Sequence, residues 1–216
     1  MTKSGSPLLR SRLVAALAAA LFVPLFILRG IGPFDFWWWM SASLVLLIGL
    51  GAALDADYVP FLRRDFGESA AKKIGQGLLA AAGLYLIFFV GNWAARLVLP
   101  FAGANIGQVY GFKSGAPVLR IVLSMALIIG PGEELFWRAY LQRRWQKRFG
   151  PAAGWLAATA LYTLVHIGSG NPMLVLAAAL CGLFWGYLYM KTGSALLVVV
   201  SHTVWDIAVF LVVPFR

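Results

Sequence analysis

Six ionisable residues lie inside strongly apolar segments of this chain, all in its second half. Two of them are the only histidines that the chain contains. An ionisable residue in the hydrocarbon of a bilayer costs roughly 2.5–3.5 kcal/mol on insertion scales, so such residues usually mark a functional site. The six residues are Glu133, Glu134, Arg138, His166, His202 and Asp206.

These residue types suit the hydrolysis of an amide bond. A carboxylate and a histidine on either side of a water molecule can activate that water as a nucleophile. A second histidine with a hydrogen-bonding neighbour can stabilise the oxyanion that forms. Alternatively, Glu133, His166 and His202 could bind a divalent metal such as zinc, which lowers the pKa of its bound water. The residues leave both versions open, with a metal cofactor or with none.

Helical spacing separates the roles of the two glutamates. Glu134 and Arg138 are spaced i,i+4 and can pair on one helix face. Glu133 points about 100° away around the axis and has no obvious cation, so it is the better candidate base. The Gly-Pro-Gly run at 130–132 predicts a local break that would place both glutamates near a helix N-terminus.

Spacing also predicts that the acidic and histidine residues meet at one depth. Glu133 precedes the basic turn at 143–151 by about as many residues as His166 follows it. In an antiparallel pair of helices the two side chains then reach the same level. His202 and Asp206 are spaced i,i+4 on the last apolar segment and lie at a comparable depth. We therefore expect one polar cavity.

The composition is that of a polytopic membrane protein. Of the 216 residues, 61% are hydrophobic and 12% are charged, with a mean hydropathy of +0.82, whereas a soluble domain is about 25% charged. The net charge of +10 does not indicate binding to nucleic acid, because the lysines and arginines lie in short loops between apolar stretches, where they act as orientation signals. The expected surroundings are the lipid bilayer.

Seven apolar stretches could cross a hydrocarbon core of ~30 Å, and only helices satisfy the backbone there. Most lysines and arginines, Lys3 among them, fall on one side if the N-terminus is inside. We expect an all-α, polytopic membrane helix bundle of about seven transmembrane helices, N-terminus inside, in the cell (inner) membrane. The stretches cover approximately residues 13–29, 36–54, 77–99, 117–142, 151–168, 172–190 and 194–213.

Because all six candidate site residues lie in the second half, we predict an N-terminal three-span region, 1–110, and a catalytic core of about four spans, 111–216. We predict a solvated loop with a short surface helix over 55–75 and an outward-facing loop over 101–115. The tryptophan run 37–39 is typical of a membrane interface. Gly182 and Gly186 predict a helix-packing face, and packing or interfacial roles are expected for Trp137, Trp155, Trp185 and Trp205.

Three motifs of this sequence resemble those of the CPBP family. The family's motifs E-E-x-x-x-R, F-x-x-x-H and H-x-x-x-N/D correspond here to residues 133–138, 162–166 and 202–206, in that order and on separate predicted spans. Tyr162 stands where the family pattern has phenylalanine, and its hydroxyl needs a partner if it is buried. The family includes CAAX prenyl endopeptidases of the Rce1 type and bacterial intramembrane proteases linked to bacteriocin processing and self-immunity. The resemblance covers about residues 117–216.

The resemblance implies an intramembrane endopeptidase that cleaves a membrane-tethered peptide or protein. Its members have been described both as metalloproteases and as metal-independent glutamate proteases, so zinc stays an open alternative. By this resemblance, Glu133 would be the general base and His166 would assist it. His202 and Asp206 would stabilise the oxyanion as a pair, and Glu134 and Arg138 would be supporting residues.

Two other classes stay open on the residues alone. One is a proton-coupled transporter whose buried acids and histidines relay protons. The other is a catalytically silent membrane scaffold in which the polar set holds helices together. The absence of an inverted repeat counts against a transporter. The brevity of the chain and its alanine-rich spans favour a bacterial protein, and the sequence leaves its oligomeric state open.

Overall fold

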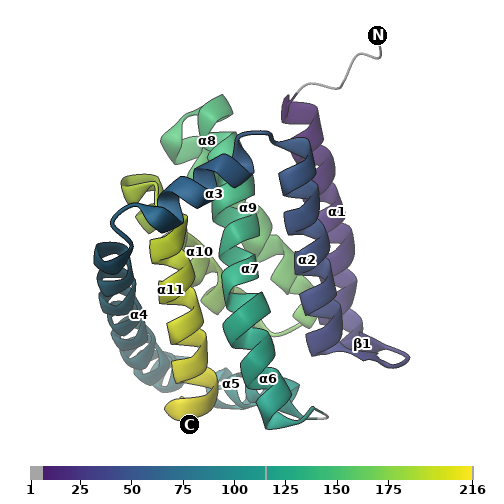
Figure 1. The fold of residues 1–216 in the computed structure, drawn as a ribbon. Coiled ribbons are helices and arrows are strands. Elements are labelled where there is room, and N and C mark those ends of the chain that lie inside the picture. The colour runs from purple at the N-terminus through teal and green to yellow at the C-terminus, as the bar shows by residue number, and fades with distance from the viewer. Residues whose placement is uncertain (1–6, 115, 216) are drawn as a thin grey trace.

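The computed structural model describes residues 7–114 and 116–215, so Lys3 lies outside the described residues. The chain is 87% helical, which confirms the predicted all-α class. Figure 1 shows long helices packed side by side, with short elements at both ends of the bundle. The long helices are α1 (Pro7–Leu28), α2 (Phe36–Leu54), α4 (Ala70–Val98), α9 (Pro151–His166), α10 (Pro172–Thr192) and α11 (Ala195–Ile207). The short elements are β1 (Gly30–Ile31), β2 (Phe34–Asp35), α3 (Tyr58–Gly67), α5 (Ala102–Tyr110), η1 (Gly111–Lys113), η4 (Ile167–Ser169) and η5 (Ala208–Val212).

This is a multi-pass membrane protein, but the predicted count of seven spans is not confirmed. Within the described ranges, five helices are long and apolar enough to cross a membrane, namely 8–28, 36–54, 70–98, 172–192 and 195–212. A sixth candidate is the pair of helices 102–113 and 118–149, which is bent by 96°. α9 has only 16 residues, fewer than the roughly 20 that a hydrocarbon core needs.

The helix that carries both glutamates changes its winding on either side of them. The predicted break at 130–132 is wrong, because the backbone keeps right-handed helical angles at Ile129 (φ −74°, ψ −59°) and Leu135 (φ −61°, ψ −41°). A π-helical turn precedes Pro131, whose ring would clash with the turn before it in a regular α-helix. Glu133 and Glu134 therefore lie within a continuous helix. Its segments are α6 (Val118–Ser124), π-helical η2 (Met125–Ile129), α7 (Gly130–Glu134), π-helical η3 (Leu135–Gln142) and α8 (Arg143–Phe149).

The charged residues assigned to the inside converge at one end of the bundle. α3 lies across this end near α8 (Figure 1) and is the short surface helix predicted over 55–75. Asp55 forms ion pairs with Arg143 at 2.8 Å and Arg144 at 2.9 Å. Asp65 accepts a hydrogen bond from the backbone N–H of Leu196 at 2.8 Å, at the start of α11. That this end faces the inside stays a prediction.

At the other end, a short hairpin lies between α1 and α2, and a helix lies where we expected a loop. β1 and β2 pair antiparallel, and α5 lies within 101–115, where an outward loop was predicted. Asp35 accepts hydrogen bonds from the backbone N–H groups of Trp37 and Trp38, both at 3.1 Å, and so caps α2. Burial alone would raise the pKa of Asp35, but hydrogen bonds from Arg120 and from these N–H groups hold it below its usual value.

The interfacial prediction for the tryptophan run 37–39 fails for its first member. Trp37 is buried and donates its indole N–H to the carbonyl of Phe112 at 3.1 Å. Trp38 is half exposed, and the Arg120 guanidinium lies 5.4 Å from the centre of its ring. Only the outward-facing side of the run is therefore free to meet the membrane interface.

Close backbone approaches bring neighbouring helices of the bundle into contact. A Cβ at Gly182 would lie 2.9 Å from Cγ2 of Thr159, so α9 and α10 touch as the glycine pair predicted. A Cβ at Gly77 would lie 2.8 Å from the carbonyl oxygen of Leu197, which brings α4 against α11. One hydrophobic core includes residues from both predicted regions, while the division at residue 110 stays a prediction.

Two glycines of α4 give a matched test of this packing. We expect Gly77→Ala to lower the free energy of unfolding by about 1–3 kcal/mol, because its methyl group overlaps Leu197 and Val200 of α11. Gly83→Ala meets nothing within 4 Å and should be neutral or stabilising by up to about 1 kcal/mol through helix propensity. Thermal unfolding in detergent measures both. Equal shifts of the two variants would contradict the close contact of α4 with α11.

Candidate functional site

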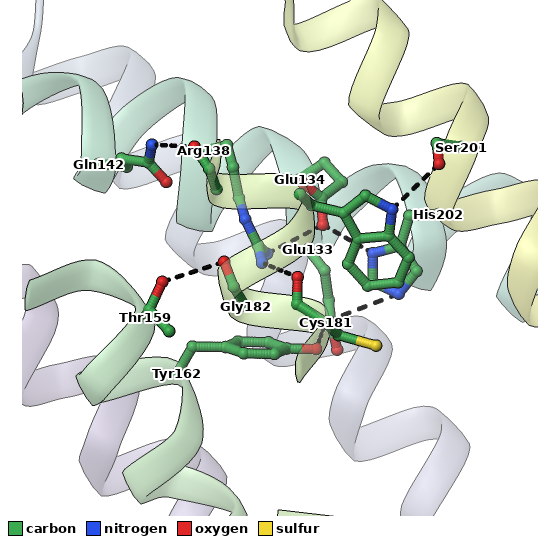
Figure 2. Close-up of polar contacts among 12 residues, drawn as sticks. Glu133, Glu134, Arg138, Gln142, Thr159, Tyr162, Cys181, Gly182, Ser201 and His202 are labelled. Atoms are coloured by element: carbon green, nitrogen blue, oxygen red, sulfur yellow. Dashed lines mark hydrogen bonds and ion pairs between the residues drawn. The ribbon is translucent and has the colours of Figure 1, made fainter. Parts of the chain in front are cut away.

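The structure buries all six predicted site residues and brings them together from three parts of the fold. Their exposed fractions lie between 0% and 7%. Figure 2 shows the glutamates on α7 facing His202 of α11 on one side and Tyr162 of α9 on the other. The six residues are Glu133 and Glu134 on α7, Arg138 on η3, His166 at the end of α9, and His202 and Asp206 on α11.

Glu134 is the centre of a buried ion-pair cluster. Its Oε1 accepts a hydrogen bond from Nη1 of Arg138 at 2.9 Å, as the i,i+4 spacing predicted. The same oxygen lies 2.7 Å from Nδ1 of His202, which donates to it. Sequence reasoning missed this second contact, because His202 follows 68 residues later on another helix. Glu134 therefore serves as a counter-ion for two donors.

His202 has carboxylates at both ring nitrogens. Its Nε2 lies 3.4 Å from Oδ2 of Asp206, the predicted i,i+4 partner, and 4.0 Å from Oε2 of Glu133. Carboxylates only accept hydrogen bonds, so a doubly protonated ring with a donor at each nitrogen suits this arrangement best. The ring can thus present a positively charged N–H group toward Glu133.

Trp185 is a site residue that the sequence assigned to packing. Its indole ring stacks on the His202 imidazole at 3.8 Å between ring centres and 20° between planes. Its Nε1 donates to Oγ of Ser201 at 3.1 Å. No spacing along the sequence indicates this contact, because Trp185 and His202 lie on different helices.

Glu133 receives its hydrogen bond from Tyr162, not from a cation. The Tyr162 hydroxyl donates to Oε2 of Glu133 at 2.8 Å, which gives this buried hydroxyl the partner that it needs (Figure 2). His166, one turn further along α9, donates its Nδ1–H to the carbonyl oxygen of Tyr162 at 2.7 Å. A carbonyl can only accept, so in the neutral ring Nε2 of His166 is the unprotonated nitrogen.

The first helix also supports the site. The ring of Phe26 lies 4.5 Å from the His166 ring, and Phe22 lies 5.9 Å from Trp137 in the glutamate helix. Sequence reasoning missed both contacts, because phenylalanines in an apolar span carry no signal that distinguishes a site wall from a lipid-facing surface. The first helix therefore contributes side chains that pack against residues of the site.

A cavity of about 270 Å³ joins the polar residues to a large apolar wall. Glu133, Tyr162, His166, His202 and Asp206 line it. The rest of the wall is mostly apolar and comes from α1, α2, α4, α5, α10, α11 and the short segments η1, η2 and η5. Examples are Phe26, Trp37, Met40, Phe88, Ile106, Leu176 and Val209. Such a cavity suits an apolar substrate segment whose reacting bond lies against the polar residues.

The donor set does not fit a zinc site. In the part of the chain that the structure describes, no group of three or more His, Cys, Asp and Glu side chains could hold a metal ion. Of the three ligands suggested by the sequence, His202 has both nitrogens against carboxylates and His166 has Nδ1 on a backbone carbonyl.

The comparisons with known proteins identify the region that carries the motifs. Residues 115–208 match the model of the Rce1-like family, described as type II CAAX prenyl endopeptidase Rce1-like. No curated protein and no solved structure matches the chain. At the family level the match supports a CAAX-type intramembrane protease that acts on a membrane-embedded protein or peptide. Residues 115–208 are thus similar to the Rce1-like family, in agreement with the resemblance of the three motifs to the CPBP family.

Proposed function

We propose that this protein is a glutamate-type intramembrane endopeptidase that hydrolyses a peptide bond of a membrane-associated protein or peptide. One observation carries the proposal. Glu133, His166 and His202, from three different helices, line one cavity whose remaining wall is mostly apolar. Buried ionisable groups that line a mostly apolar cavity of a membrane protein usually mark a functional site.

In the proposed reaction, Glu133 is the general base. Within the described residues no hydrogen bond uses its Oε1, and Oε2 is occupied by the Tyr162 hydroxyl. Oε1 can therefore take a proton from a water molecule that also donates to Nε2 of His166. The water oxygen bonds to the substrate carbonyl carbon, and the electron pair of the C=O bond moves to oxygen. The C–N bond then breaks, and the proton on Glu133 passes to the leaving amine.

His202 is the proposed stabiliser of the oxyanion. A positively charged Nε2–H near the reacting carbonyl lowers the energy of the developing negative charge most effectively where water is excluded. Asp206, at 3.4 Å, and Glu134, at 2.7 Å, orient the ring. Arg138 supports the cluster by holding Glu134. These roles follow the family pattern residue by residue.

The proposed substrate carries an apolar segment or group next to the cleaved bond. The cavity wall supports this, because most of its side chains are apolar. A membrane-tethered peptide or protein meets the requirement, and the family match favours such a hydrolase over the proton-coupled transporter and the silent scaffold. A location in the inner membrane of a bacterium stays a prediction.

Replacing each of the two neighbouring glutamates by glutamine tests their different proposed roles, general base for Glu133 and counter-ion for Glu134. We expect Glu133→Gln to lower the cleavage rate by about 10²- to 10⁴-fold, the usual contribution of a general base. Its stability should stay near that of the wild type, because an amide oxygen still accepts from Tyr162. The assay uses fluorogenic peptides tethered to proteoliposomes, one with an isoprenoid-modified cysteine and others with an apolar transmembrane anchor.

Glu134→Gln is the matched control. It removes the carboxylate from Arg138 and His202, and breaking a buried ion pair costs about 3–5 kcal/mol. We expect a large decrease in the thermal unfolding temperature, which Glu133→Gln does not produce. If Glu133→Gln cleaves any of the peptides at the wild-type rate, the proposed mechanism is wrong.

Chelation tests the metal-free version of the mechanism. Because the described donor residues do not form a metal-binding group, we expect 1,10-phenanthroline and EDTA to leave the cleavage rate unchanged. Elemental analysis of the purified protein should find less than stoichiometric metal. Loss of activity on chelation, with recovery on addition of one equivalent of zinc, would instead identify a metalloprotease.

A further inference from the structure

The hydroxyl of Tyr162 makes a contact that the fold does not require. A phenylalanine ring would fill the same space, and the family pattern that this segment resembles has phenylalanine here. The hydroxyl instead donates to Oε2 of Glu133 at 2.8 Å, and both side chains are 5% exposed. A hydrogen bond to a buried carboxylate is among the stronger ones in proteins, so it restricts the orientation of Glu133.

The ring of Tyr162 is itself held on several sides. The guanidinium carbon of Arg138 lies 4.8 Å from its centre. The ring of Trp137 meets it edge-on at 5.4 Å, and the ring of His166 meets it at 4.8 Å and 62°. A ring with these neighbours has little freedom to rotate, so the position of its hydroxyl oxygen is defined by α9. This links Glu133 on α7 to a second helix.

The backbone of Tyr162 orients the second member of the proposed pair. Its carbonyl oxygen accepts Nδ1–H of His166 at 2.7 Å, which leaves Nε2 as the acceptor. One residue therefore contacts both groups that are proposed to flank the attacking water. It does so through two different atoms, and only the hydroxyl depends on the side chain.

We propose that Tyr162 is a positioning residue for the hydrolysis, which rests on the proposed function of the site. Its hydroxyl holds Oε2 of Glu133, so that Oε1 faces the water beside Nε2 of His166. Without the hydroxyl, Glu133 could rotate toward His202, whose Nε2 lies 4.0 Å from the same Oε2. An ion pair between these two groups would withdraw the base from the water and occupy the oxyanion donor.

The test removes the hydroxyl oxygen and keeps the ring and the backbone carbonyl. We expect Tyr162→Phe to lower kcat by about 10- to 100-fold, as the loss of one hydrogen bond to a charged group implies. KM should be unchanged, because the hydroxyl acts on Glu133 and not on the substrate. Rates are measured with the tethered peptide that the wild type cleaves fastest.

Tyr58→Phe is the control for the loss of a tyrosine hydrogen bond. The Tyr58 hydroxyl donates to the carbonyl of Leu135 at 3.0 Å, and the side chain is fully buried but outside the cavity lining. We expect both variants to lose a similar, small amount of thermal stability. Only Tyr162→Phe should lose turnover.

A double-mutant cycle distinguishes positioning from a general structural effect. If Tyr162 acts through Glu133, the variant Glu133→Gln/Tyr162→Phe retains the residual rate of Glu133→Gln, because the two losses are not additive. Additive losses, or a wild-type kcat for Tyr162→Phe, would overturn the role of Tyr162. A Glu133→Gln variant as active as the wild type would overturn the proposed function instead, so the two failures differ.

Discussion

The carboxylate of Glu134 is the constraint on which the rest of the site depends. A guanidinium and an imidazolium inside a membrane bundle need a counter-charge, because each alone would lose its hydration without compensation. One oxygen of Glu134 accepts hydrogen bonds from both Arg138 and His202. This ties the glutamate helix to α11 and orients the His202 ring, which leaves the neighbouring Glu133 to face the cavity.

The two glutamates are neighbours on α7 and have different partners. η2 and η3 flank α7, and a π turn adds a residue to the turn and changes which side chains share a face. Within α7 the two side chains point about 100° apart around the axis, so Glu134 faces α11 while Glu133 faces Tyr162 on α9. The Tyr58 hydroxyl donates to the carbonyl of Leu135, where η3 begins, and so links the basic end of the bundle to the glutamate helix.

The contacts that could be predicted from sequence are those between residues of the same helix. Spacing of i,i+4 placed Glu134 with Arg138 and His202 with Asp206, and both pairs are present. Hydropathy predicted an all-α membrane bundle, and Gly182 predicted a helix-packing face, against which α9 lies. Hydropathy could not establish the number of spans, because it counts apolar residues and does not place the ends of helices.

Spacing and composition thus determined which residues are the candidates for the chemistry, since a helix has a known rise and rotation per residue. Only the tertiary structure decided how the helices rotate against one another. That rotation gives Glu133 its contact with Tyr162, places Trp185 on His202, and turns Phe26 and Trp37 into walls of the site. The physical reason is that side-chain packing between helices sets their relative rotation, and no spacing along a single helix records it.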